Sequence, residues 1–215
     1  MSNTLSNSPA HVILVHGLAG SPMAMWPLAW QLRKSGYSSS TFGYPSWFWS
    51  IEHHATRFRH RLDKLQNDES ISEFNIVAHS MGAIVTRQAI LEQHLRYPKL
   101  RRIVMLASPN QGSPVARVMG NVLPFCKTLR QLSTHPESFV RQLPEPQWQD
   151  IGIVAAKYDR VVPISNSRLA AASGHTVLFS GHNGLLVRPA AARLVIEFLN
   201  HGSFSAVESS SSSSV

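Results

Sequence analysis

Short, mostly apolar runs alternate along the chain with longer segments in which apolar residues recur every three or four positions. The longer segments predict helices at 22–35, 51–65, 81–96, 165–173 and 189–200. The runs between them predict strands at 12–16, 39–42, 76–78, 102–107, 151–155 and 176–179. Because helical segments separate the strands, the strands should be mostly parallel. The pattern therefore predicts an α/β protein with about six strands flanked by helices, a three-layer sandwich.

This pattern covers one domain, predicted to span residues 10–204. A chain of 215 residues, 43% of them apolar, is long enough to bury one substantial core. Residues 1–9 precede the first strand and should be flexible, and the Ser-rich tail 205–215 should be disordered. Residues 113–149 lie between the fourth and fifth strands and are a candidate cap or lid insertion.

The turn after the third predicted strand holds the most informative motif. Residues 78–82 read Ala-His-Ser-Met-Gly, directly after an Asn-Ile-Val run. Small residues on both sides of a Ser let a strand pass into a helix through a tight turn that exposes the Ser80 hydroxyl. A Ser here also suits a helix N-cap, so other residues must decide between the two interpretations.

Two more polar residues follow later strands in the same way. Asp159 comes after the strand at 151–155, and His182 comes after the strand at 176–179. A Ser hydroxyl needs an imidazole to remove its proton, and the imidazole needs a carboxylate on its other nitrogen to fix the tautomer. The order Ser, Asp, His at the carboxyl ends of strands predicts that Ser80, Asp159 and His182 form a catalytic triad.

Other residues compete for these roles. His16 and His79 flank a loop glycine or the Ser itself, which favours structural or supporting roles for both. His175 precedes its strand and His201 follows the last helix, so neither belongs to the carboxyl edge. Asp150 precedes its strand as well, whereas sites in open α/β sheets collect at the carboxyl edge.

A Gly-rich loop follows the first strand. Residues 15–22 read Val-His-Gly-Leu-Ala-Gly-Ser-Pro, and a backbone N–H of such a loop can point at a developing oxyanion. With residues 78–82, 158–163 and 181–186, this loop resembles small bacterial lipases and esterases of the α/β-hydrolase superfamily. The resemblance is strongest to the minimal Bacillus-type lipases, which also carry Ala before the nucleophile turn. It covers about residues 10–200.

That resemblance implies the α/β-hydrolase fold and the same three catalytic residues. It also implies an oxyanion hole made by the backbone N–H groups of Leu18 and Met81. Two departures bear on the substrate class. Residues 107–113 resemble a Pro-His-x-Gly-Ser segment of larger lipases and lipase-like deacylases, but Asn110 stands where His is frequent. Residues 113–149 form a longer segment than a minimal lipase needs.

Substrate recognition is predicted from residues near the carboxyl edge. The candidate substrate-binding residues are His16, Gly17, Tyr44, Trp47 and Phe48. An aromatic cluster at 44–49 suits a pocket wall and a core-packing loop equally. The apolar residues between 115 and 143 suit either a cap over the site or an ordinary pair of packing helices.

Charge and composition limit the classes of partner and cofactor that we expect. The net charge of +8 and the pI near 10.3 can attract nucleic acid or anionic lipid, but the basic residues are scattered and no nucleic-acid module is recognisable. We expect no nucleic-acid partner and a small-molecule or lipid ester substrate, with transient contact to a lipid interface. The single Cys126 excludes an internal disulfide and a Cys-based metal cluster, and no metal or cofactor is expected.

No run of 18 apolar residues and no secretory leader is visible, which predicts a cytoplasmic location. We expect a serine carboxylic-ester hydrolase, an esterase or lipase with an acyl-enzyme intermediate on Ser80. The same groups would serve a thioesterase, an amidase or an acyltransferase. A non-catalytic hydrolase-like protein that binds a lipid or a partner in the same pocket is a second hypothesis, and a basic nucleic-acid binder is a third. The oligomeric state is left open.

Overall fold

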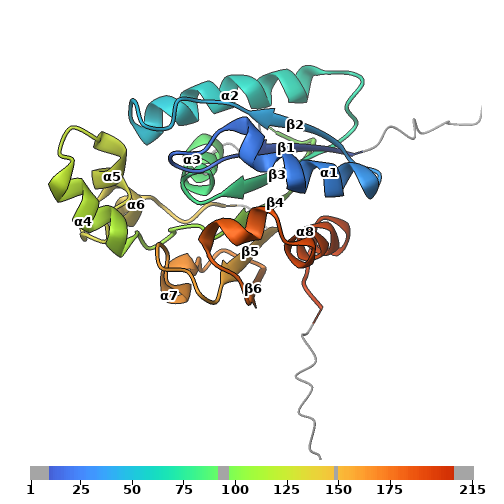
Figure 1. The fold of residues 1–215 in the computed structure, drawn as a ribbon. Coiled ribbons are helices and arrows are strands. Elements are labelled where there is room, and N and C mark those ends of the chain that lie inside the picture. Colours follow the sequence, from blue (N-terminus) through green and yellow to red (C-terminus); the bar gives the residue numbers. More distant parts are fainter. Residues whose placement is uncertain (1–9, 92–96, 148–149, 206–215) are drawn as a thin grey trace, which may run out of the picture.

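Six parallel strands form the centre of the molecule (Figure 1). The structure is a computed structural model, and it describes residues 10–91, 97–147 and 150–205. The sheet order is β2-β1-β3-β4-β5-β6, and each neighbouring pair is parallel. The strands are β1 (His11–Val15), β2 (Ser38–Phe42), β3 (Phe74–His79), β4 (Leu100–Leu106), β5 (Ile151–Ala156) and β6 (Gly174–Leu178). The predicted six-stranded parallel sheet is confirmed.

Helices cover both faces of the sheet because each central strand is apolar on both sides. In β1, Ile13 and Val15 belong to the hydrophobic cluster under α2 (Ile51–Asn67) and α3 (Met81–Ile90). Val12 and Leu14 belong to the cluster under α1 (Trp26–Lys34) and α8 (Pro189–His201). The predicted three-layer arrangement is therefore confirmed.

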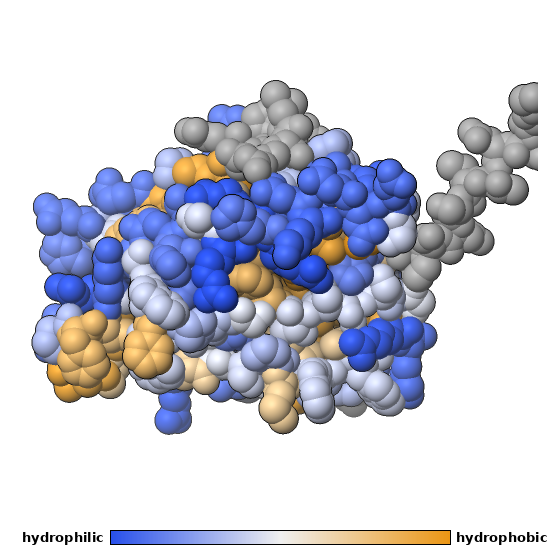
Figure 2. Space-filling model, turned by 90° about the horizontal axis from the view of Figure 1, so that it is seen from above, coloured by the Kyte–Doolittle hydropathy of each residue, from blue (hydrophilic) through white to orange (hydrophobic). Residues whose placement is uncertain are grey.

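Three short helices lie together beside the sheet, at the left-hand end of Figure 1. They are α4 (Pro114–Val122), α5 (Lys127–Gln131) and α6 (Phe139–Gln142), all inserted between β4 and β5. The Ser113 hydroxyl caps α4 by accepting the N–H of Ala116. Seen from above, hydrophobic residues gather at this same end of the molecule (Figure 2).

The first and the fourth predicted helices differ from the structure in more than their end residues. The first helix begins with a 3-10 turn, η1 (Pro22–Met25), before α1. The predicted helix at 165–173 is reduced to the four residues of α7 (Ile164–Ser167). The Ser167 hydroxyl donates to the carbonyl oxygen of Ile164 at 2.7 Å, a side-chain bond that competes with helical bonding.

Several predicted segments fall outside the described residues. These are the flexible segment 1–9, the end of the predicted helix 81–96 beyond residue 91, and all of the tail 205–215 except its first residue. Within the described residues, no helix combines the length and the apolar composition that crossing a membrane requires.

Candidate active site

The turn between β3 and α3 holds Ser80 in a strained conformation. Its φ of 52° and ψ of −124° lie in a region that L-residues rarely adopt. A Cβ at Gly82 would lie 2.6 Å from the carbonyl oxygens of both Val15 and His16. A Cβ at Gly17 would lie 2.8 Å from the Cβ of Ser80. The two glycines therefore let β1 and its loop pack directly against the turn, as a nucleophile elbow requires.

Ser80, His182 and Asp159 form a continuous hydrogen-bonded chain. The Nε2 of His182 lies 3.0 Å from the Oγ of Ser80. On the other side of the ring, Nδ1 lies 2.7 Å from the Oδ2 of Asp159 and donates to it. With that tautomer, Nε2 carries a lone pair toward the Ser80 hydroxyl and can accept its proton.

The Asp159 carboxylate is held by both of its oxygens. Oδ1 accepts the N–H groups of Val161 and Val162 at 2.8 Å each, and Oδ2 accepts from His182. Burial opposes ionisation, but the hydrogen bonds from His182 and the two N–H groups outweigh it. The pKa of Asp159 therefore lies below its usual value. Asp159 thus both fixes the turn that follows it and pairs with His182.

Three of the competing residues, His175, His201 and Asp150, lie elsewhere. His175 sits in the first half of β6 and pairs with the Ser167 hydroxyl at 2.9 Å. His201 ends α8, and Asp150 faces Arg102 at 3.5 Å.

The loop after β1 is folded tightly above the strand ends. The N–H of Gly20 donates to the carbonyl oxygen of Gly17, and Ala19 between them has a φ of 59°. In the part of the chain that the structure describes, no hydrogen bond occupies the N–H of Leu18 or of Met81. Both groups are therefore free to donate to a ligand, and their role in an oxyanion hole stays a prediction.

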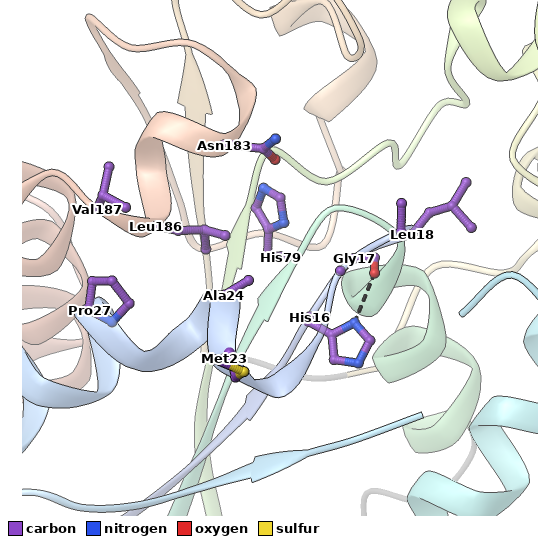
Figure 3. Close-up of a pocket in the computed structure, with 12 residues that line it drawn as sticks. His16, Gly17, Leu18, Met23, Ala24, Pro27, His79, Asn183, Leu186 and Val187 are labelled. Carbon is purple, nitrogen blue, oxygen red and sulfur yellow. Dashed lines mark hydrogen bonds between the residues drawn. The ribbon is translucent and has the colours of Figure 1, made fainter. Parts of the chain in front are cut away.

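His16 and Tyr44 support this loop from below. Their rings stack with centroids 4.4 Å apart, and the Tyr44 hydroxyl donates to the His16 carbonyl oxygen at 2.6 Å. The His16 Nδ1 bonds to the carbonyl oxygen of Gly17 at 2.9 Å (Figure 3). Burial lowers the pKa of His16 and raises that of Tyr44. Tyr44 is therefore a buried prop of the loop.

Two cavities flank the loop. The one that reaches Ser80 has a volume of about 240 Å³. Its apolar wall comes from the loops after β1, β4 and β5 and from α4 and α5: Leu18, Ala19, Pro109, Val115, Ala116, Leu129, Leu132, Val161 and Val162. The second, of about 380 Å³, lies behind the loop and includes Met23, Ala24, Pro27, Leu186 and Val187 (Figure 3). Leu18, Ala19, His79 and Asn183 line both cavities.

None of the five candidate substrate-binding residues lines the Ser80 cavity, although Gly17 packs against the Ser80 turn. His16 and Gly17 line the second cavity, and Tyr44 is buried beneath the loop. Trp47 and Phe48 line neither cavity and are 49% and 65% exposed.

Sequence reasoning missed part of the wall around Ser80. Pro109, Val161 and Val162 line that cavity although none was a candidate. The available signal was the apolar Val-Val-Pro run directly after Asp159.

Comparison with known proteins identifies the architecture. A family model described as the PGAP1-like alpha/beta domain matches residues 60–158. The mature lipase BlEst2 of Bacillus licheniformis superposes with a TM-score of 0.67 at 16% identity, over 90% of this chain and 92% of that chain. The chain has the α/β-hydrolase fold. The fold implied by the sequence resemblance is thereby confirmed.

Two other α/β-hydrolase structures align over a similar share of this chain. Lipase B of Aspergillus fumigatus gives a TM-score of 0.73 at 17% identity, over 91% of this chain but only 54% of that chain. A monoacylglycerol lipase of Paleococcus ferrophilus gives 0.64 at 17% identity, over 91% of this chain and 96% of that chain. No curated protein sequence matches the chain significantly.

Within this α/β-hydrolase fold, Asn110 belongs to a buried hydrogen-bond network. It is buried, and its Nδ2 donates to the Ser167 carbonyl oxygen at 2.7 Å and to the Ser108 hydroxyl at 2.9 Å. Its Oδ1 accepts from the buried Arg87, whose guanidinium also donates to the carbonyl oxygens of residues 143 and 144. Asn110, which stands where His is frequent, and Arg87 therefore connect α3 to the loop after β4 and to the segment that follows α6.

Among residues 10–91, 97–147 and 150–205, no three His, Cys, Asp or Glu side chains are placed to hold a metal ion together. The expectation that catalysis needs no metal or cofactor stays a prediction.

Proposed function

We propose that the chain is a serine hydrolase of carboxylic esters. The observation that carries the proposal is the hydrogen-bonded chain from Ser80 through His182 to Asp159, at 3.0 and 2.7 Å. It opens into an apolar cavity beside two unoccupied backbone N–H groups. Nucleophile, base, orienting acid and oxyanion donors are the set that acyl transfer needs.

In the proposed acylation step, the Ser80 Oγ attacks the ester carbonyl carbon while His182 Nε2 takes the hydroxyl proton. The carbonyl oxygen becomes an oxyanion that the N–H groups of Leu18 and Met81 stabilise. When the intermediate collapses, the carbon–oxygen bond to the alcohol breaks. The proton held on His182 passes to the leaving oxygen, and the acyl group remains on Ser80.

Deacylation repeats the same steps with water. His182 removes a proton from water, the hydroxide attacks the acyl carbon, and the Ser80–acyl bond breaks. The proton returns to Ser80, and the carboxylic acid leaves. Asp159 stays ionised throughout, since its pKa is held low, and stabilises the imidazolium of His182 in each half-reaction.

The cavity limits the acyl group. Its volume of about 240 Å³ lies below the range of about 300–1,000 Å³ typical of drug-sized ligands. We therefore propose esters with short apolar acyl chains as the best soluble substrates. Because the similar structures named above are lipases, we extend the natural substrate class to lipid esters.

Labelling with a fluorophosphonate probe, followed by peptide mapping, tests this function. The wild-type protein should form a covalent adduct on Ser80 and hydrolyse p-nitrophenyl butyrate. The Ser80→Ala protein should do neither while melting at the same temperature. If folded wild-type protein forms no adduct and hydrolyses no ester, the proposal fails and a non-catalytic binding protein takes its place. If the adduct forms on Ser80, hydrolysis rates on esters and thioesters of the same acyl group separate an esterase from a thioesterase.

A further inference from the structure

One face of α4 exposes large apolar side chains to solvent. Val115, Val118, Met119 and Val122 recur at the three- and four-residue spacing of a single helix face. Val118 and Val122 are 63% and 65% exposed. The opposite edge of the helix is packed, because Ala116 and Gly120 are buried. The exposed apolar face is thus separate from the side of α4 that stabilises the fold.

The loop between β2 and α2 extends this face. Trp47, Phe48 and Trp49 are three consecutive large side chains, and each is about half exposed or more. Trp49 has a φ of 62°, which is unfavourable for a bulky residue, and its carbonyl oxygen accepts from the Thr128 hydroxyl at 2.9 Å. The loop is therefore held outward against the start of α5.

The two apolar segments meet at the turn before α5. Phe125 is 82% exposed, and the Sγ of the next residue, Cys126, lies 4.0 Å from the Trp47 carbonyl oxygen. We call the combined surface the apolar platform; it consists of the exposed face of α4, Phe125 and residues 47–49. Figure 2 shows hydrophobic residues gathered at this end of the molecule. Such a contiguous patch marks an interaction surface.

Charge identifies the kind of partner. Between 113 and 143 the chain carries four basic residues and one acidic residue, Glu137: the basic ones are Arg117, Lys127, Arg130 and Arg141. The whole chain has a net charge of +8. Two copies would carry this positive charge toward each other, whereas an anionic lipid surface would attract it. Trp side chains beside apolar ones also suit a membrane–water boundary.

The platform adjoins the mouth of the cavity at Ser80. Val115 is exposed on the platform and also lines that cavity, together with its neighbour Ala116. We propose that the apolar platform docks on the surface of an anionic lipid bilayer and sets the opening of the Ser80 cavity against it. Docking itself is independent of the proposed hydrolysis. Delivery of a lipid ester to Ser80 rests on the proposed function.

Vesicle sedimentation of the full chain tests the docking. One vesicle set contains phosphatidylcholine alone, and the other contains about one-third phosphatidylglycerol. We expect binding to the anionic vesicles that weakens with salt. The Phe48→Ser/Phe125→Ser and Val118→Ser/Val122→Ser proteins should each bind at least roughly tenfold more weakly. The control Trp26→Ser/Trp30→Ser changes two exposed aromatics of α1, outside the platform, and should bind like wild type.

Thermal melting and soluble p-nitrophenyl ester hydrolysis accompany each variant. A folded variant with lost vesicle binding and retained soluble activity supports docking by the platform. If the wild-type protein binds anionic vesicles but hydrolyses no ester, the proposed hydrolase function is wrong and the docking proposal is still supported. The docking is wrong if wild type ignores anionic vesicles or binds neutral ones equally, or if the platform variants bind unchanged. If light scattering shows that the wild type is a dimer, that the platform substitutions dissociate it, and that the wild type does not bind vesicles, the surface is instead an interface with a second copy.

Discussion

The His79 Nε2 lies 3.2 Å from the backbone carbonyl oxygen of His182 and donates to it. The residue directly before the proposed nucleophile is thereby tied to the proposed base, and the two rings lie 4.9 Å apart. Burial, followed by the proximity of His182, lowers the pKa of His79 to about 3. His79 is therefore expected to be neutral at physiological pH, and we predict that it positions His182.

Replacing His79 tests that position. His79→Leu removes the donor, frees the His182 backbone to shift, and should lower kcat roughly 10- to 100-fold with little change in KM. His79→Gln keeps an N–H donor in a similar place and should retain most of the activity. Steady-state kinetics on a soluble ester separate the outcomes. Equal activity in the Leu and Gln proteins would show that the hydrogen bond does not position His182.

Asp159→Asn should abolish most turnover with little loss of structure. An amide oxygen can still accept the Val161 and Val162 N–H groups, but the amide then presents N–H groups to His182 and favours the wrong tautomer. In serine proteases the equivalent change lowers kcat by about 10⁴-fold, and we expect a loss of that order here. The check is kcat together with the thermal melting temperature. A variant that keeps a tenth of wild-type kcat would remove Asp159 from the proposed mechanism.

Glycine substitutions separate the demands of the fold from those of the site. Gly17→Ala places a methyl group 2.8 Å from the Ser80 Cβ, so activity should fall sharply. Gly82→Ala drives a methyl group to 2.6 Å from two backbone oxygens and should cost about 1–3 kcal/mol of stability. Gly181→Ala is the matched control, because nothing lies within 4 Å and its φ is −89°. Urea unfolding and ester hydrolysis are measured on all three. A Gly181→Ala protein as impaired as Gly17→Ala would contradict this account.

Acid should destabilise the native state through two buried histidines. Burial is the main reason that the pKa of His54 falls to about 4 and that of His79 to about 3, against a usual value of 6.5. As the pH falls below 6.5, the unfolded chain takes up protons that the native state refuses. Each histidine then removes about 1.4 kcal/mol of unfolding free energy per pH unit, until its native pKa is reached.

The substitution His54→Leu isolates one of these contributions. Within the described residues, neither ring nitrogen of His54 has a hydrogen-bond partner, so an apolar side chain of similar size should be tolerated or stabilising. Urea unfolding at about pH 7.5 and about pH 5 should show a smaller acid-induced loss in the variant than in wild type. An identical pH dependence in both proteins would mean that His54 is protonated in the native state.

Much of the fold and of the candidate site follows from local sequence. Ser80 directly follows β3, and Asp159 and His182 lie in the loops that follow β5 and β6. Because parallel strands bring their carboxyl ends to one edge, the proximity of the three residues could be predicted. Their catalytic roles stay predictions. The strands could be identified because continuous apolar runs such as β3 and β5 must be buried on both faces.

The outward direction of the aromatic loop, residues 47–49, could not be predicted in the same way. Three consecutive large side chains show no period, and their exposure depends on contacts with residues far along the chain. Trp47 and Trp49 are held by Cys126 and Thr128, each 79 positions away. The brevity of α7 was equally hidden, because it depends on whether the Ser167 hydroxyl bonds locally or to solvent.

Cys126 gives the protein a built-in reporter of its own motion. It is the single cysteine of the sequence, and it is buried at the junction of α4, α5 and the aromatic loop. A thiol reagent can reach the sulfur only while this junction is open, so the rate of modification measures how often it opens. Fluctuations of the inserted helices can therefore be timed in the unaltered protein, without introducing any label.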